Sequence, residues 1–341
     1  MKYFESDLNI LADYIYENGF SNCSFLVTGA TGLIGSIIVK SLVLCNDKYK
    51  TEIKIKATVR SLEKVKEVFS GDNFNQIEFI VQDIAEQLKC DGVDYLIHTA
   101  TPTESKFFIS NPVETIKAIC NGSIAVLDFA KNNNVKGMVY LSSMEVFGSA
   151  HTSDEKTTED QLGYIDIANV RSCYSESKRL VECACKCYAE EYGVPVKVAR
   201  LAQTFGAGIS KKENRVFAQF ARSALSGSDI VLHTKGDSVG NYCYTTDAIK
   251  GILLLLKKGC NGEAYTVVNE QTTMSIREMA EMVIKEFGND KIKLKFDIPN
   301  DNKYGYAPKT GVRLSSAKLN SLGWRAVVGL KEAYQRMMED L

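Results

Sequence analysis

The sequence predicts an α/β protein built on a doubly wound parallel sheet, followed by a smaller C-terminal α/β part. Six short apolar runs, each typical of a buried strand, alternate with helical stretches between residues 24 and 201. Alternation of this kind favours a parallel sheet with helices on both faces. The alternation loosens after residue 203, where glycines become frequent, and there we expect the smaller part.

The elements follow from local patterns. Apolar residues recur at a helical period from Leu8 to Ile15 and the period ends at Gly19, which predicts an N-terminal helix that we expect to act as a lid. The first strand runs into a glycine-rich turn, and an amphipathic helix is expected over residues 34–43. The expected strands are residues 24–29, 53–59, 78–81, 95–98, 137–142 and 196–201.

Composition excludes several classes of function. The 341 residues carry 41 basic and 42 acidic side chains, so the net charge of −1 gives no reason to expect nucleic acid or an anionic membrane as a partner. The longest apolar run, at 252–256, is too short to span a bilayer. Ten scattered cysteines predict free thiols in a reducing compartment, so we expect a cytoplasmic enzyme. Three well-separated histidines predict no metal site.

Gly29, Gly32 and Gly35 lie between the first expected strand and the helix that follows it. Glycines at this spacing allow a tight turn, close approach of a pyrophosphate to the backbone, and close packing of helix on strand. In this context the motif predicts a Rossmann-type dinucleotide site. Three glycines in an ordinary turn are the alternative.

Tyr174 and Lys178 stand four residues apart in an expected helix, so they share one face. An ammonium near a phenol favours the ionised phenol, which makes tyrosine a usable base. Moving a phenol pKa from about 10 to near neutrality requires roughly 4 kcal/mol, which a close cation and a cationic nicotinamide ring together can supply. The spacing alone also occurs by chance on solvated helices.

Several motifs occur in one order along the chain. They are the glycine motif, HisThrAla at 98–100, SerSerMetGluValPheGly at 142–148, the Tyr174/Lys178 pair, the ArgLeuAlaGlnThrPheGlyAlaGly run at 200–208 and the run at 316–324. In these motifs the chain resembles an extended short-chain dehydrogenase/reductase of the NAD-dependent epimerase/dehydratase family, whose members modify sugar nucleotides. The resemblance covers nearly the whole chain.

The resemblance implies a role for each matching residue. Ser143 would orient the reacting sugar oxygen, Tyr174 would take its proton, Lys178 would tune Tyr174, and Glu145 would be a second acid/base unless it only bonds a neighbouring loop. The implied cofactor contacts are Gly29, Thr31, Gly32, Leu33, Ile34, Gly35, Arg60, Asp83, Ile84, Thr99, Ala100 and Lys178. The implied substrate contacts are Ser143, Tyr174, Gln203, Arg215 and Arg313. Surface roles for Asp83 and the two arginines stay open.

Two departures from the family pattern bear on the reaction. Met144 stands where the family's dehydratases carry an acid, so the sequence favours an epimerase or a decarboxylase over a 4,6-dehydratase. The run at 171–182 is also similar to the corresponding helix of UDP-glucuronate decarboxylases. Gly240 stands where relatives usually place an arginine that grips the diphosphate, which weakens the prediction of a nucleotide-sugar substrate.

The cofactor, the domain division and the assembly are also predicted. The second strand ends at Arg60 without the acid that binds adenosine ribose, and with Lys64 this favours NADP over NAD, although an arginine can also stack on adenine in an NAD enzyme. Residues 1–203, with 238–270 returning to them, are expected to bind NAD(P), and residues 204–237 and 271–341 the substrate. The helix at 112–131 and the helix of Tyr174 are expected to form a homodimer.

The sequence therefore predicts an NAD(P)-dependent enzyme that transiently oxidises a nucleotide-activated sugar at carbon 4 and then returns the hydride. One alternative is an NADPH-dependent carbonyl reductase, which net consumption of cofactor would reveal. A second is a non-catalytic NAD(P)-binding sensor or scaffold. Proteins of that kind generally lose the tyrosine, lysine or serine, whereas this chain retains all three.

Overall fold

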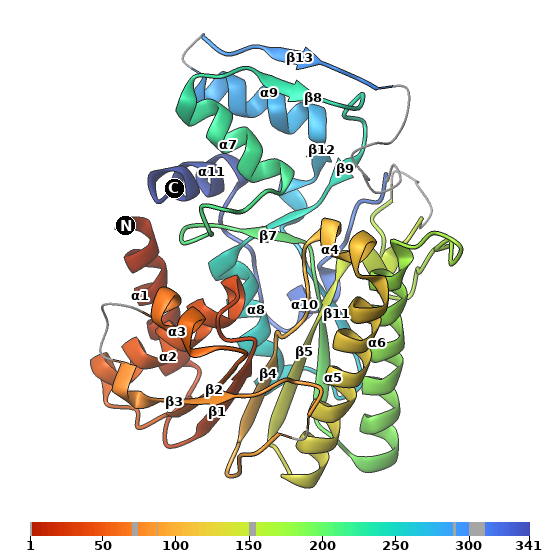
Figure 1. Cartoon of the computed structure of the whole chain (residues 1–341). Coiled ribbons are helices and arrows are strands. Elements are labelled where there is room, and N and C mark those ends of the chain that lie inside the picture. Colours follow the sequence, from red (N-terminus) through yellow and green to blue (C-terminus); the bar gives the residue numbers. More distant parts are fainter. Residues whose placement is uncertain (1, 70–73, 87, 150–154, 289–290, 300–310) are drawn as a thin grey trace.

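A computed structural model describes residues 2–69, 74–86, 88–149, 155–288, 291–299 and 311–341. Its centre is a seven-stranded sheet in the order β11-β6-β5-β4-β1-β2-β3, and every neighbouring pair is parallel (Figure 1). The strands are β1 Ser24–Thr28, β2 Lys54–Val59, β3 Ile77–Val81, β4 Tyr95–His98, β5 Gly137–Ser143, β6 Val196–Leu201 and β11 Ala264–Val267. The predicted doubly wound α/β fold is confirmed, and all six predicted strands are present with ends shifted by at most one residue.

Helices cover both faces of this sheet. On one face lie α2 Leu33–Tyr49 and α8 Thr245–Lys258, and on the other lie α5 Pro112–Asn132 and α6 Ser172–Tyr192 (Figure 1). The shorter helices beside them are α3 Leu62–Val68, α4 Ser105–Ser110, α10 Ala317–Ser321, η1 Phe74–Gln76 and η2 Met144–Phe147. The two-sided cover explains why the strands are apolar runs rather than alternating ones.

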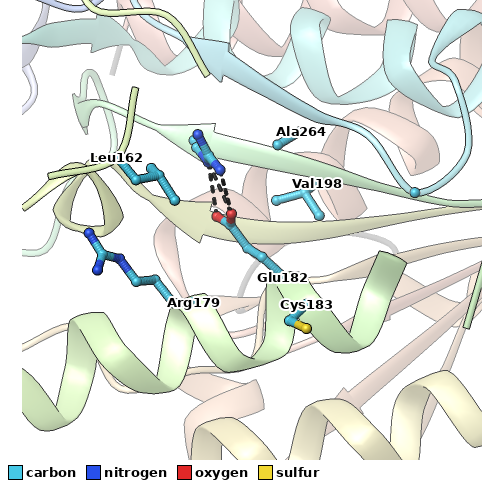
Figure 2. Close-up of a pocket in the computed structure, with 8 residues that line it drawn as sticks. Leu162, Arg179, Glu182, Cys183, Val198 and Ala264 are labelled. Carbon is cyan, nitrogen blue, oxygen red and sulfur yellow. Dashed lines mark hydrogen bonds and ion pairs between the residues drawn. The ribbon is translucent and has the colours of Figure 1, made fainter. Parts of the chain in front are cut away.

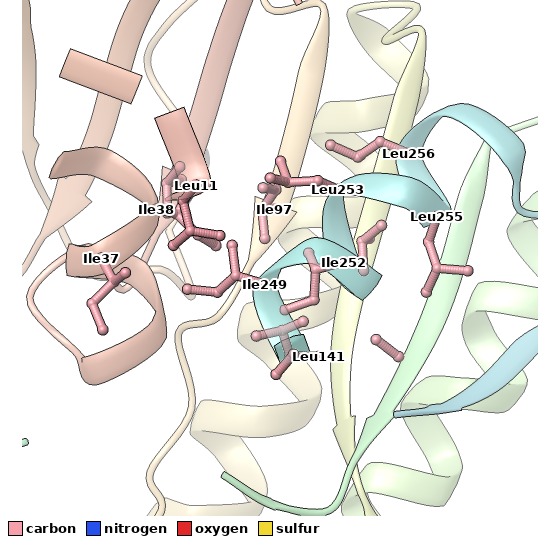
Figure 3. Packing of buried hydrophobic residues seen from close by; sticks show 14 of the residues in the cluster. Leu11, Ile37, Ile38, Ile97, Leu141, Ile249, Ile252, Leu253, Leu255 and Leu256 are labelled. Atoms are coloured by element: carbon pink, nitrogen blue, oxygen red, sulfur yellow. The ribbon is translucent and has the colours of Figure 1, made fainter. Parts of the chain in front are cut away.

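The larger core lies between the sheet and α8. Figure 3 shows Ile249, Ile252 and Leu253 of α8 pointing toward Ile97 and Leu141 of the sheet, and all except Leu141, which is 6% exposed, are fully buried. The apolar run at 252–256 therefore belongs to α8, the central helix of this core. Among the described residues, no helix is long and apolar enough to cross a membrane.

A smaller lobe with its own core is built from segments on both sides of β11 in the sequence and sits above the carboxyl edge of the sheet (Figure 1). Its helices are α7 Val216–Ser226, α9 Ile276–Phe287, α11 Leu330–Glu339 and η3 Glu270–Thr272. Its strands pair in twos and are β7 Gln203–Phe205 with β10 Tyr242–Tyr244, β9 Val239–Gly240 with β12 Met274–Ser275, and β8 Ile230–Leu232 with β13 Leu294–Phe296. A capping box of Ser275 and Glu278 starts α9.

The N-terminal helix α1, Lys2–Glu17, is not a lid. Its residues Leu11, Ala12 and Ile15 are fully buried, and the helix packs on α2, α8 and α11. The buried Asp7 accepts hydrogen bonds from Tyr244 Oη at 2.5 Å and Arg336 Nη1 at 2.8 Å. The expectation of a lid is wrong because the apolar residues of α1 pack against α2 and α8, and its Asp7 binds Tyr244 and Arg336 of the smaller lobe.

Candidate active site

The predicted site residues gather at the carboxyl edge of the sheet. The register aligns Thr28 of β1 with Thr58 of β2 and His98 of β4, so the loops that follow these three strands leave the sheet side by side. Ser143 ends β5 at the same edge. In open parallel sheets this edge, outside the carboxyl ends of the strands, is where ligands bind.

The glycine loop has the shape that a dinucleotide needs. Gly29 has a φ of +66°, and a Cβ there would lie 2.7 Å from Ala100 Cα, so only glycine fits. A Cβ on Gly35 would lie 2.6 Å from the Gly29 carbonyl oxygen. Helix α2 begins at Leu33 after Gly32, which offers no side chain to cap the first backbone N–H groups. Those groups and the helix dipole suit a pyrophosphate.

The segment after β4 closes one side of this loop. Thr99 Oγ1 donates to the Thr28 carbonyl oxygen at 2.7 Å, and the Ala100 backbone lies against Gly29. His98 lies between Thr28 Oγ1, at 2.7 Å, and Ser123 Oγ, at 3.0 Å. Burial, followed by the charge of Lys178, lowers the pKa of His98 to about 3, so this imidazole is neutral and structural.

The other predicted cofactor residues surround the loop less closely. Leu33 and Ile34 start α2 and are half-buried against the core, as Thr31 is half-buried before them. Ile84 lies against α5 at Gly122, where a Cβ would be only 2.8 Å from Ile84 Cγ2. Asp83 is exposed, and its Oδ1 accepts from the Ala85 N–H at 3.0 Å, whereas Arg60 is exposed directly after β2.

Tyr174 is buried one turn into α6. Its ring stacks on Phe108 of α4, with centroids 4.3 Å apart and planes 12° apart, and the Ser143 hydroxyl is near enough to the phenol to act on its pKa. Burial and then the charge of Glu145 raise the pKa of Tyr174, against the opposing effects of Ser143, Arg171 and Arg215. The serine and the tyrosine are thus brought together as predicted.

Lys178 is placed differently from the expectation. Its ammonium donates to the Leu141 carbonyl oxygen at 2.7 Å and to Thr101 Oγ1 at 3.3 Å, and it lies 5.8 Å from the centre of the Tyr174 ring. Burial lowers the pKa of Lys178 to about 7. Burial raises the pKa of Tyr174 and lowers that of Lys178, so lowering of the Tyr174 pKa by Lys178 together with a cationic nicotinamide stays a prediction.

Glu145 is held by a residue that sequence reasoning missed. Arg171 Nη1 donates to Glu145 Oε2 at 2.7 Å and its Nη2 donates to Oε1 at 2.9 Å, a bidentate pair. Arg171 lies three residues before Tyr174 on the same side of the helix, and that spacing was the available signal. Nothing in the sequence indicated Phe108.

The predicted substrate residues are divided between two places. Arg215, paired with Glu213 Oε2 at 2.7 Å, is near enough to Tyr174 for its charge to lower the phenol pKa, an effect smaller than that of burial. Gln203 starts β7, and its buried Oε1 has no hydrogen-bond partner among the described residues, so it can accept one from a ligand. Arg313 is exposed and lies near Glu278 of α9, in the smaller lobe.

The position where relatives usually carry an arginine is closed. A Cβ on Gly240 would lie 2.2 Å from Tyr242 Oη, so the buried Tyr242 ring and a side chain at 240 exclude one another. The structure thus gives a steric reason for glycine at this position.

A cavity of about 290 Å³ is lined by Arg179 and Glu182 of α6, Val198 of β6 and Ala264 of β11 (Figure 2). In it Arg200 Nη2 donates to Glu182 Oε2 at 2.7 Å, and this buried pair fastens α6 to β6 beneath Lys178. Cys183 also lines the cavity. Of the three cysteines at 183–187, Cys185 is buried whereas Cys183 and Cys187 are exposed. Within the described ranges, no group of three or more His, Cys, Asp or Glu side chains is placed to hold a metal.

Comparison with known proteins shows a matching family and several similar enzymes. Residues 25–269 match the model of the NAD dependent epimerase/dehydratase family. The chain is 29% identical over 321 residues to UDP-glucuronic acid decarboxylase 6 of Arabidopsis thaliana, covering 94% of this chain and 89% of the relative. It is 27% identical to UDP-glucuronic acid decarboxylase 1 of Danio rerio, covering 92% and 71%.

Solved structures show the same fold at lower identity. A UDP-N-acetylglucosamine 4-epimerase from Methanobrevibacter ruminantium superposes with a TM-score of 0.79 at 19% identity, covering 94% of this chain and 98% of that one. A dTDP-glucose 4,6-dehydratase from Bacillus anthracis, in complex with NAD, gives 0.74 at 20% identity, with 93% and 96% covered.

Proposed function

Because this chain belongs to the NAD-dependent epimerase/dehydratase family, we propose that it converts a nucleotide-activated sugar by transient oxidation at carbon 4. The observation that carries the proposal is the cluster of Tyr174, Ser143 and Lys178 at the sheet edge that also holds the glycine loop. Bound NAD(P)⁺ would supply the hydride acceptor and later the hydride donor.

The chain's own residues would handle the protons. Ser143 donates a hydrogen bond that orients the carbon 4 oxygen, and Tyr174 takes the proton from that oxygen as the ketone forms. Lys178, fixed by the Leu141 carbonyl oxygen, would bind the nicotinamide ribose of the cofactor, and its pKa of about 7 would leave it partly protonated near neutral pH. When the hydride returns to carbon 4, Tyr174 gives the proton back to the oxygen.

We propose UDP-glucuronate as the substrate and decarboxylation as the net reaction. A ketone at carbon 4 lies β to the carboxylate at carbon 5, so the electrons of the breaking bond flow into the ketone and CO₂ leaves. Carbon 5 then takes a proton, and the restored ketone is reduced. The bidentate pairing commits both oxygens of Glu145 to Arg171, and so not to a departing hydroxyl. Met144 offers no acid either, and UDP-glucuronic acid decarboxylases are among the relatives.

Cofactor choice and domain roles belong to the same proposal. Arg60, exposed at the end of β2, is placed to meet a 2′-phosphate, which favours NADP over NAD. Lys64, the other cation of that prediction, is paired with Glu67 at 3.0 Å. We assign NAD(P) binding to residues 1–203 with 238–270, and substrate binding to 204–237 and 271–341.

A homodimer in the cytoplasm is the proposed assembly. Apolar side chains are exposed on α5 and α6, where Val113, Ile116 and Leu180 are 53%, 44% and 58% accessible. Two such helix pairs would bury these side chains against each other. All ten cysteines are free, which fits a reducing compartment. A monomeric mass by light scattering at micromolar concentration would refute the dimer.

The test begins with denaturing the purified protein and identifying any released nucleotide by mass spectrometry. The protein is then offered UDP-, GDP-, CDP- and dTDP-sugars, including UDP-glucuronate, while the absorbance of reduced nicotinamide is followed. Loss of CO₂ from UDP-glucuronate with no lasting absorbance change supports the proposal. Net consumption of NADPH with a carbonyl compound would instead establish a reductase.

A further inference from the structure

Arg171 joins three segments that meet around Tyr174. Its two terminal nitrogens bind both oxygens of Glu145, which lies in η2 directly after β5. Its Nη2 also donates to Ser105 Oγ of α4 at 3.2 Å. Arg171 itself immediately precedes α6, the helix that carries the tyrosine.

The guanidinium is also part of a stack that ends at the tyrosine. Its central carbon lies 5.9 Å from the centre of the Phe108 ring, and the Phe108 ring also stacks on the ring of Tyr174, with centroids 4.3 Å apart. The Arg171 side chain is 13% exposed and Glu145 is 30% exposed. Charges that are this poorly hydrated interact more strongly than charges in open solvent.

This arrangement places the acidic Glu145 near Tyr174, the proposed base, and opposes the negative charge of Glu145 with the positive charge of Arg171. The charge of Glu145 opposes ionisation of Tyr174, while the Ser143 hydroxyl and the charges of Arg171 and Arg215 favour it. Both terminal nitrogens of Arg171 are already bound to Glu145, whereas its buried Nε has no hydrogen-bond partner among the described residues.

We infer that Arg171 is a positioning residue, whose guanidinium holds Glu145 and Phe108 in place and lets the Glu145 charge stand beside Tyr174 without blocking release of the phenol proton. This inference rests on the proposed function in that Tyr174 is the base.

The experiment compares Arg171→Gln, Glu145→Gln and the double variant with the wild type. Arg179→Gln is the matched control, since Arg179 lies on the same helix and donates to the backbone oxygens of Val146 and Gly163. Ionisation of Tyr174 is followed in the NAD⁺ complex by NMR of isotope-labelled tyrosine, with the signal assigned by its loss in Tyr174→Phe. The pH profile of kcat/KM for UDP-glucuronate is measured in parallel.

The single variants should displace the titration in opposite directions. Arg171→Gln should move it upward by about one pH unit and Glu145→Gln downward by a similar amount, as nearby charges do. The double variant should titrate near the wild type, because both charges are gone. Arg179→Gln should leave the titration unchanged, and Arg171→Lys should keep it near the wild type while lowering kcat.

The two proposals fail in different ways. Equal titrations in the wild type and both single variants would overturn the role of Arg171, even if every protein turns over UDP-glucuronate. A loss of activity in Arg171→Gln at all pH values without displacement would show a merely structural role and overturn it too. If the Tyr174 titration is displaced in the two single variants but neither the wild type nor any variant turns over a nucleotide sugar, the role of Arg171 stands and the proposed function is rejected. Glu145→Gln keeps the test decisive if Arg171→Gln does not fold.

Discussion

The buried Lys178 should make the protein more stable as the pH rises above neutrality. Its side chain is 1% exposed, and burial lowers its pKa to about 7, whereas a lysine in the unfolded chain titrates near 10.4. Between these values the unfolded chain binds the proton more tightly, so protonation favours unfolding. The folded state therefore gains stability as the pH rises from about 7 toward about 10, and below about 7 the contribution is constant.

The size of the effect follows from the same two values. Each pKa unit corresponds to about 1.4 kcal/mol, and half of the folded molecules carry the proton at a pH near 7, so stability should rise by roughly 2 kcal/mol between about pH 7 and pH 9. Lys178→Met removes the titrating group and should lack this rise. Lys106→Met, at an exposed lysine of α4, is the control and should keep it.

The assay is urea unfolding of the three proteins at both pH values, after bound nucleotide has been removed. Other groups also titrate in this range, so the quantity of interest is the difference between Lys178→Met and the wild type. An equal rise in these two proteins would refute the reasoning, since it would mean that Lys178 keeps an ordinary lysine pKa when buried.

Three further predictions concern the loop, the N-terminal helix and the buried histidine. Gly29→Ala should abolish retention of nucleotide and cost at least about 1 kcal/mol of stability, whereas Gly19→Ala, with a similar φ but open space, should keep the nucleotide; equal binding in both would contradict the steric argument. Asp7→Ala should lower the unfolding free energy by about 2 kcal/mol because it removes the buried carboxylate that binds Tyr244 and Arg336, although Arg336 keeps its pairing with Glu332, and Glu5→Ala on the same helix by almost nothing, as urea titration would show. NMR of His98 should show a neutral ring down to about pH 4, and a titration near pH 6.5 would contradict its burial between two hydroxyls.

Much of the fold was predictable because local pattern and tertiary role agree. The strand at 95–98 was predicted with its exact ends, since four apolar or buried side chains stand between clear breaks. The glycine loop was predictable because its backbone shape allows no Cβ at Gly29. The positions of Ser143 and Tyr174 were predictable because Ser143 ends a strand and Tyr174 lies near the start of a helix.

The rest depended on contacts between segments distant in the chain. Nothing near Phe108 indicates that it stacks on a tyrosine 66 residues later, since 174 − 108 = 66. The state of Lys178 depended on its burial against Leu141, which the i, i+4 spacing does not reveal. The N-terminal helix was mistaken for a lid because the partners of its Asp7, Tyr244 and Arg336, lie 237 and 329 residues further along the sequence.

The central claim is that Tyr174 supports removal of a hydride from carbon 4 and its return to the same atom. The most direct test supplies UDP-glucuronate deuterated at carbon 4 to the wild type and to Tyr174→Phe, and follows the products by mass spectrometry and NMR. The account predicts a decarboxylated product that keeps the deuterium at carbon 4 in the wild type, and a loss of turnover of at least about a hundredfold in the variant. Deuterium lost to solvent, or a variant as active as the wild type, would contradict it.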